Sequence, residues 1–183
     1  MRDTDRRVIY TKKLLRDSLM KLMAEKPVGR ISVTELCKGA GVNRGTFYSH
    51  YRQPEDVLKN IEEDLFNDIR DILSTIEDSG EKHKAILYAL YRNREACRLL
   101  VSPNGDPTCI SRMMEISYEF FSRNVVPTLN TTEETSRFIH AFISSGTVAV
   151  LSEWLASDSP CPPEEMADLL TITHKKLLSQ TNI

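Results

Sequence analysis

The chain has 183 residues, a hydrophobic content of 40% and a formal net charge of −2, values typical of one or two globular domains with a buried core. No uninterrupted apolar run approaches the roughly 20 residues of a membrane-spanning helix, and the first residues, Met1 to Arg7, lack the apolar stretch of a signal peptide. We therefore expect a cytoplasmic protein that does not associate with membranes.

Apolar residues recur at helical spacing along nearly the whole chain, which predicts an all-α fold. The first predicted helix ends before Pro27. The second begins at Ser32, which can form a capping box with Glu35, and runs to about residue 38. A turn is expected at residues 39–41, and Asn43 is suited to cap a third helix that runs to about residue 50.

A long fourth helix is predicted over residues 54–78, with Pro54 in its first turn and Ser79-Gly80 at its end. Further helices are expected at about 82–100, 107–125, 132–156 and 164–179, with loops at 102–107 and 157–163. The chain shows no alternating strand pattern, internal repeat or low-complexity segment.

Basic and acidic residues are unevenly distributed along the chain. Residues 1–53 contain twelve Lys or Arg and five Asp or Glu, whereas residues 54–183 contain twelve basic and twenty-one acidic residues. This asymmetry is typical of a part that faces nucleic acid joined to a part that does not. Chance clustering on solvated surfaces is the alternative interpretation.

Residues 32–51 have the layout of two short helices joined by a tight turn, which is how a helix is presented to the DNA major groove. Cys37 and Ala40 are small enough for the two helices to cross closely, and Gly41 tolerates a left-handed backbone. Phe47 and Tyr51 fall on the side of the third helix opposite its polar residues. We expect these two rings to anchor the helix to a core.

The polar and basic side chains of this segment are the predicted DNA contacts. Thr46 and Tyr48 project from the front of the third helix, and Arg44 is expected to bind guanine or to contact phosphate. Ordinary helix surface is the alternative. The predicted DNA-contacting residues are Ser32, Thr34, Asn43, Arg44, Gly45, Thr46, Tyr48, Ser49, His50 and Arg52. Four basic residues of the first helix, Arg6, Arg7, Lys12 and Lys13, either approach the DNA backbone or form a mobile charged tail.

The run Gly45-Thr46-Phe47-Tyr48-Ser49-His50-Tyr51, with Ile31-Ser32-Val33-Thr34 and Ala40-Gly41-Val42-Asn43 before it, resembles the helix-turn-helix of the TetR family of transcriptional regulators. The resemblance implies an all-helical homodimer with a three-helix DNA-binding head and a ligand-binding, dimerising body. Most members are repressors that a small molecule releases from DNA. Pro54 stands where the family often has a phosphate-contacting Lys, so Arg52 is the candidate to replace that contact.

The resemblance implies a DNA-binding domain at residues 1–54, a connecting helix at about 54–78, and an effector-binding and dimerisation domain at 79–183. The segment around Phe142, Gly146 and Trp154 is similar to the bodies of one TetR subgroup. Aromatic and Met residues of the body are candidates for an effector pocket, although plain core is the alternative: Tyr88, Tyr91, Met113, Met114, Phe120 and Phe121. A dimer interface built from four helices is expected at Phe138, Phe142, Gly146, Val150, Trp154, Leu169 and Leu170.

The leading hypothesis is therefore a dimeric repressor that binds a palindromic double-stranded DNA operator and is released by a small-molecule effector. The alternative is a ligand-independent activator or coactivator partner that is controlled by protein contacts. An enzyme is not expected, because no nucleophile–base arrangement, metal-ligand cluster or glycine-rich phosphate loop is present. We expect no cofactor and no catalytic or metal-binding residue, and we interpret Glu62, Glu63 and Asp64 as a solvated helix face.

The cysteines Cys37, Cys97, Cys109 and Cys161 include no Cys-x-x-Cys pair. In a reducing cytosol they are expected to be free thiols that pack as small apolar residues. A redox-sensing role for one of them stays open.

Overall fold

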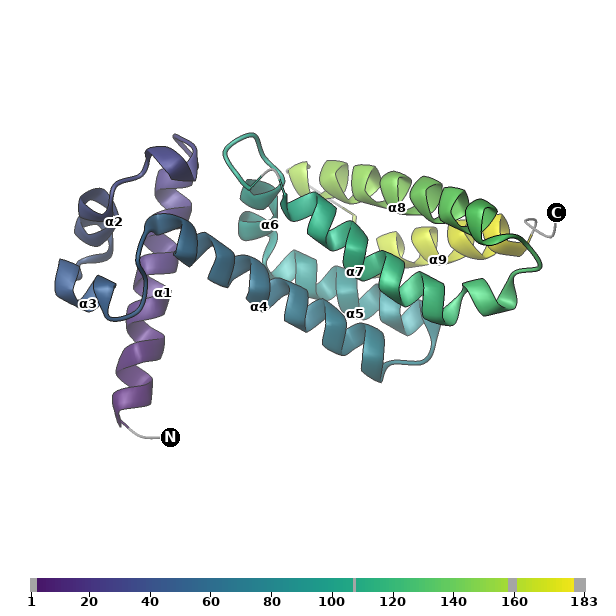
Figure 1. Ribbon diagram of the computed structural model, residues 1–183, viewed down its shortest axis with the longest axis horizontal. Helices are drawn as coiled ribbons and strands as arrows, with labels where there is room; N and C mark the ends of the chain where they lie inside the picture. Colours follow the sequence, from purple (N-terminus) through teal and green to yellow (C-terminus); the bar gives the residue numbers. More distant parts are fainter. Residues whose placement is uncertain (1–2, 107, 158–160, 180–183) are drawn as a thin grey trace. The chain divides into compact units, whose positions relative to one another are not determined.

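The computed structural model describes residues 3–106, 108–157 and 161–179, and it confirms the all-α prediction, since these residues form helices and no strands. Figure 1 shows the helices α1 (Asp3–Met23), η1 (Val28–Arg30), α2 (Val33–Ala40), α3 (Arg44–Tyr48), α4 (Pro54–Thr75), α5 (Ser79–Arg92), α6 (Arg94–Leu100), α7 (Cys109–Asn124), η2 (Val126–Thr128), α8 (Glu133–Ala156) and α9 (Pro163–Ser179). Residue 107 of the first expected loop and residues 158–160 of the second lie outside the described residues.

Two helix boundaries differ from the prediction. Helix α4 ends at Thr75, and Ser79-Gly80 opens α5 instead of ending α4. The reason is Asp78, whose carboxylate accepts a hydrogen bond from the backbone N–H of Glu81 (2.9 Å) and so caps α5. The predicted helix over 82–100 is two helices, because the chain turns at Asn93, whose side chain donates to the carbonyl of Ala89 (2.9 Å).

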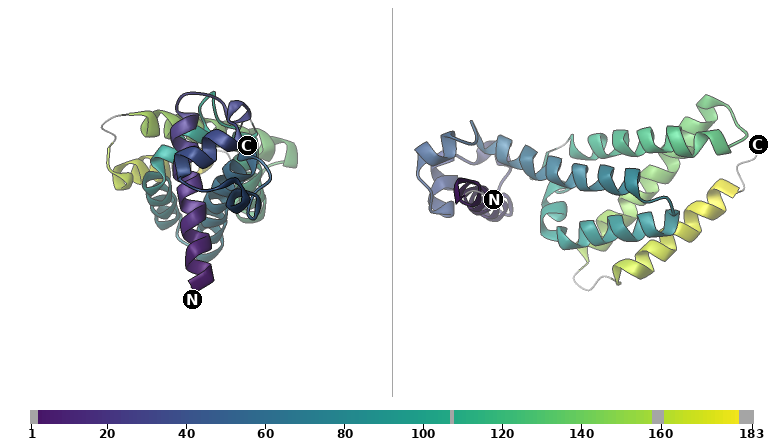
Figure 2. Two further views of the ribbon diagram at one scale, coloured as in Figure 1. Left: turned by 90° about the vertical axis from the view of Figure 1, so that its left-hand side faces the viewer. Right: turned by 90° about the horizontal axis from the view of Figure 1, so that it is seen from below.

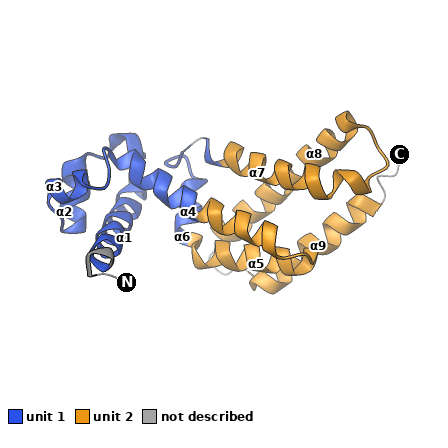
Figure 3. Cartoon of the chain, turned by 60° about the horizontal axis from the view of Figure 1, so that its bottom comes forward, with its two compact units in different colours: residues 1–64, 95–109 blue, residues 65–94, 110–183 orange. Residues whose placement is uncertain are grey.

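The chain divides into two compact units, coloured separately in Figure 3. Unit 1 comprises Met1–Asp64 and Glu95–Cys109, and unit 2 comprises Leu65–Arg94 and Ile110–Ile183. Unit 1 has a core of fully buried side chains from α1, α2 and α3, including Leu15, Leu19, Leu36 and Phe47. The loop after α6 joins this unit, since the Asn104 side chain donates to the carbonyl of Met23 (2.9 Å).

In unit 2, α5 and α9 lie side by side (Figures 1 and 2). A chain of hydrogen bonds joins them to α8. The Thr171 hydroxyl lies 2.8 Å from His83 Nδ1, and His83 Nε2 lies 3.2 Å from His174 Nδ1. His174 Nε2 lies 2.9 Å from the Thr147 hydroxyl, which donates to the carbonyl of Ile143 (2.7 Å). Because the Thr147 hydroxyl proton is used on Ile143, the chain requires a neutral His174 that donates through Nε2 and accepts at Nδ1 from His83 Nε2–H.

Candidate nucleic-acid interface

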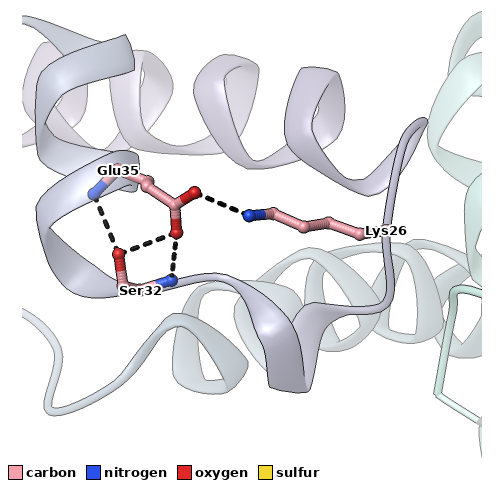
Figure 4. A network of polar contacts seen from close by, with 3 residues as sticks. All are labelled: Lys26, Ser32 and Glu35. Atoms are coloured by element: carbon pink, nitrogen blue, oxygen red, sulfur yellow. Dashed lines mark hydrogen bonds and ion pairs between the residues drawn. The ribbon is translucent and has the colours of Figure 1, made fainter.

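The start of α2 is fixed by the predicted capping box. The Ser32 hydroxyl accepts from the N–H of Glu35 (3.2 Å), and the Glu35 carboxylate accepts from the Ser32 N–H (3.0 Å) and hydroxyl (2.8 Å). Lys26 donates to the second carboxylate oxygen (2.6 Å), as Figure 4 shows. The hydrogen bond from Lys26, followed by those from Ser32, lowers the pKa of Glu35 to about 2. The Ser32 hydroxyl proton is therefore already engaged within α2.

The turn between α2 and α3 depends on two glycines. Gly41 has the left-handed backbone that the sequence predicts (φ 66°, ψ 27°), and its N–H bonds the carbonyls of Cys37 and Lys38. Gly39 lies within α2 where that helix meets α1, and a Cβ added there would lie 2.3 Å from the Ser18 hydroxyl. Ser18 in turn donates to the carbonyl of Leu36 (3.0 Å). Gly39 thus permits the close approach of the two helices that orients the turn.

Two features fix the position of α3, a cap at its first turn and aromatic side chains on its buried side. Asn43 caps it as predicted, because its side chain accepts from the N–H of Thr46 (2.7 Å). Phe47 is fully buried and Tyr51 is nearly so, which confirms their expected anchoring role. Their ring centroids lie 6.0 Å apart. Five helical residues alone would not form a stable helix in water, so these contacts fix its position.

The opposite side of α3 is open to solvent. Arg44, Gly45, Tyr48 and Ser49 are exposed, and Thr46 and His50 are half-buried. The Arg44 guanidinium donates to the Tyr48 hydroxyl (3.3 Å) and lies 5.8 Å from the centre of its ring. These two side chains therefore form a small basic and aromatic surface, which suits contacts with base edges and phosphates.

The remaining predicted DNA contacts flank α3. Ser32 and Thr34 at the start of α2 are exposed, as are Asn43 and Arg52. The backbone N–H of Arg52 donates to the Asp56 carboxylate (2.8 Å). This bond does not involve the guanidinium, which is on an exposed residue and can contact a phosphate. Of the basic residues on α1, Arg6 and Arg7 are exposed, whereas Lys12 lies over the Tyr51 ring at 5.9 Å. The predicted contacts on α2, on α3 and just after α3 are therefore exposed or half-buried, and Lys12 of α1 lies against Tyr51 just after α3.

The six candidate effector residues lie in unit 2 and do not converge on one point. Tyr88 donates a hydrogen bond to Glu164 of α9, and the Tyr91 ring lies 5.7 Å from that of Trp154 on α8. Phe121 is buried with its ring 5.2 Å from that of His140. Met113, Met114 and Phe120 are half-buried. The sequence pattern did not indicate His140, whose pKa is lowered by burial and whose Nε2 lies 3.2 Å from the Ser117 hydroxyl.

Five of the seven candidate interface residues are exposed on α8 and α9: Phe138, Phe142, Gly146, Val150 and Leu169. Together with Ile172 of α9, which is exposed but was not predicted, they are here called the α8–α9 face. Phe138 and Phe142 are 66% and 70% exposed, and Leu169 is 53% exposed. Trp154 and Leu170 are instead buried within unit 2 and do not contribute to this face. By length and composition alone, α8 would also suit a membrane span. The buried residues of α8 nevertheless include the polar Ser136, His140 and Ser144 beside Trp154 and Leu155.

Two further expectations concern carboxylates and thiols. Glu62 is fully buried, so the prediction that it belongs to a solvated face is wrong, whereas Asp64 is exposed. Cys97 and Cys109 are buried, and burial raises the pKa of the Cys97 thiol to about 12. Because the thiolate is the reactive form, Cys97 is a poor candidate for redox sensing.

Comparisons with known proteins agree with this architecture. Residues 15–61 match the family model for bacterial regulatory proteins of the tetR family, and residues 77–176 match a model for a transcriptional regulator C-terminal region. The chain is 26% identical over 172 residues to the uncharacterized HTH-type transcriptional regulator YxbF of Bacillus subtilis (strain 168). That match covers 89% of this chain and 44% of YxbF, so the chain spans less than half the length of this relative.

Solved structures share the fold over more than nine-tenths of the chain. A TetR transcriptional regulator from Streptococcus agalactiae 2603V superposes with a TM-score of 0.67 at 24% identity, covering 93% of this chain and 97% of that one. The dihydroxyacetone kinase operon activator DhaS superposes with a TM-score of 0.63 at 18% identity, covering 94% and 97%. At these identities the likeness concerns the fold, with its helix-turn-helix and its helical body.

Proposed function

Because the chain belongs to the TetR family of bacterial transcriptional regulators, we propose that it binds a palindromic DNA operator as a homodimer. The observation that supports this most is the presentation of α3. Phe47 is fully buried, yet Arg44 and Tyr48 one turn apart are exposed and touch each other. A short helix fixed from behind and open in front is suited to enter the major groove, with base contacts from its outer side chains.

The α8–α9 face supports the homodimer. An apolar surface of this kind on a soluble protein marks a site of association. Pairing two copies through α8 and α9 would bury Phe138, Phe142 and Leu169 in a four-helix arrangement. A Cβ added at Gly146 would meet no atom within 4 Å, so its surface is open for another helix to approach closely. Twofold symmetry would then place two α3 helices one helical turn of DNA apart, roughly 34–36 Å.

For control of DNA binding we propose a small-molecule effector that binds between α7 and α8. The buried side of α8 is polar at Ser136, His140 and Ser144, where an ordinary core would be apolar. The Ser136 hydroxyl is buried and has no hydrogen-bond partner among the described residues. Such a group is destabilising unless a water or a ligand satisfies it. An effector with hydrogen-bonding groups would supply that partner. Effector binding would then release the protein from its operator and relieve repression.

An activator or coactivator partner that responds to another protein remains the second candidate. DhaS, which has the same fold, is described as an operon activator. The two candidates differ in what changes transcription. A repressor should lower transcription from its operator in a purified system and lose that effect with a small molecule. An activator should raise transcription only when its protein partner is present.

The DNA-binding proposal can be tested without knowing the operator. Purified full-length protein is incubated with sheared genomic DNA, and the retained fragments are sequenced and footprinted. We expect a recurrent palindrome with two protected half-sites about 10 base pairs apart, centre to centre. Retention of fragments with no shared sequence would contradict the proposal.

A further inference from the structure

A cleft with a volume of about 300 Å³ lies within unit 1, between α1 and the first half of α4. Its floor is apolar, because it is formed by the buried side chains of Val57, Ile61 and Tyr51. Ile9, which is 56% exposed, forms part of the α1 wall. The volume is at the lower end of the range for small-molecule sites, which are mostly apolar with a few placed polar groups.

The polar groups of the cleft are mainly cationic. Lys12, Lys13 and Arg16 line the cleft from α1, and Arg16 lies about one turn from each of the two lysines. Arg16 is paired with Asp64 at 3.4 Å, so the charge of this carboxylate offsets one of the three cations. The Lys12 ammonium lies 5.9 Å from the centre of the Tyr51 ring, above the apolar floor. A site with two remaining ammonium groups beside an apolar floor suits a ligand that combines a negative charge with an apolar portion.

The cleft is on the side of α1 opposite α2. Ser18 faces α2, because its hydroxyl bonds the carbonyl of Leu36. Arg16 lines the cleft, and residues two apart on a helix point in nearly opposite directions. The α2 side of α1 and the cleft are therefore separate surfaces of unit 1. Tyr51 nonetheless connects the cleft to the back of α3, since its ring packs against Phe47.

We propose that this cleft binds a small amphipathic organic anion, such as a medium-chain carboxylate, behind the recognition helix. The apolar portion lies over Val57 and Ile61, and the carboxylate lies between the ammonium groups of Lys12 and Lys13. This site is distinct from the effector region proposed between α7 and α8, and its existence does not depend on that region or on DNA binding.

Isoleucine methyl groups give a local test in the full-length protein. The δ-methyl carbons are labelled, and NMR spectra are recorded during titration with octanoate, octanol or inorganic phosphate. We expect octanoate to shift the Ile9 and Ile61 methyl signals saturably and to leave Ile172 of α9 unchanged. Octanol lacks the charge and phosphate lacks the apolar chain, so both should bind at least about tenfold more weakly.

Charge variants give the second arm of the test. Replacing both Lys12→Gln and Lys13→Gln should weaken octanoate binding by about tenfold, because two charge-assisted contacts are lost. The matched control is Lys59→Gln, which removes an exposed charge from α4 outside the cleft lining. Absence of saturable shifts at Ile9 and Ile61, equal shifts with octanol, or equal weakening by Lys59→Gln would overturn the proposal. Displacement of bound octanoate by short duplex DNA at low salt would also overturn the proposal, because it would show that the cleft binds the DNA backbone.

Discussion

At the scale of single residues, the account depends most on Arg44 and Tyr48. Both side chains are exposed, and both project from a helix that Phe47 holds in place. Neither side chain contributes to the core, so each can be removed without disturbing the fold. This separation of recognition from stability makes the two residues direct probes of DNA reading.

The first prediction concerns these two side chains. Arg44→Ala and Tyr48→Ala should each weaken operator binding by roughly 1–3 kcal/mol, because each removes a base or phosphate contact. Fluorescence anisotropy with operator DNA at fixed salt measures the change, and circular dichroism checks that the fold is kept. Lys21→Ala, an exposed basic residue at the end of α1, is the control. Unchanged affinity in both variants would rule out the assigned contacts.

Local residue patterns in this chain were predictable, and distant contacts were not. The caps at Ser32 and Asn43 and the left-handed Gly41 follow from residues within three positions of each other. The role of Gly39 did not follow, because it depends on Ser18, which lies far away in the sequence. Glu62 was misjudged for a similar reason. A run of three acidic residues indicates a solvated face unless other elements cover one of them.

At the scale of helices, the hydrogen-bond chain that joins α5, α8 and α9 predicts that protein stability depends on pH. Burial, followed by the charges of His174 and Lys175, lowers the pKa of His83 to about 4. In the unfolded chain the same imidazole titrates near 6.5. The unfolded state therefore binds more protons as the pH falls below 6.5, and stability is lost between about pH 6.5 and pH 4.

Protein stability is the measurement for this second prediction. Going from pH 7 to pH 5, the free energy of unfolding should fall by about 2 kcal/mol through His83 alone. Urea denaturation of the wild type and of His83→Gln at both pH values separates this contribution, because Gln does not titrate. The variant should lose less stability than the wild type on acidification. An identical pH dependence in the two proteins would show that His83 is not held neutral.

The helix pattern also shows where prediction from sequence ends. The spacing of apolar residues predicted nearly every helix of the described chain, because this spacing depends only on the residues within each helix. It joined α5 and α6 into one helix, since the break at Asn93 involves no proline or glycine and apolar residues recur on both sides of it. Periodicity also placed Trp154 with Phe138 and Phe142 on one face, whereas Trp154 is buried with its indole N–H donating to the carbonyl of Cys161 (2.8 Å).

At the scale of the whole molecule, the α8–α9 face predicts the oligomeric state. Replacing both Phe138→Asp and Phe142→Asp should convert a dimer into a folded monomer, because charges would then have to be buried in the interface. Sedimentation equilibrium measures the mass, and Tyr10→Asp, at another exposed aromatic residue, is the control. The monomer should also bind the operator far more weakly, since half of its phosphate contacts are lost. A dimer that persists in the double variant would place the interface elsewhere.

The most direct measurement of the central claim is photo-crosslinking from the recognition helix. A p-azidophenylalanine placed at position 48 in the full-length protein is irradiated on operator DNA, and the crosslinked nucleotides are mapped. The account predicts two symmetric crosslinks in the major groove, about 10 base pairs apart. The same amino acid at position 59, outside α3, should give none. Absence of crosslinks from position 48, or equal crosslinking from position 59, would contradict the claim that the α3 helices of two protomers bind the major groove.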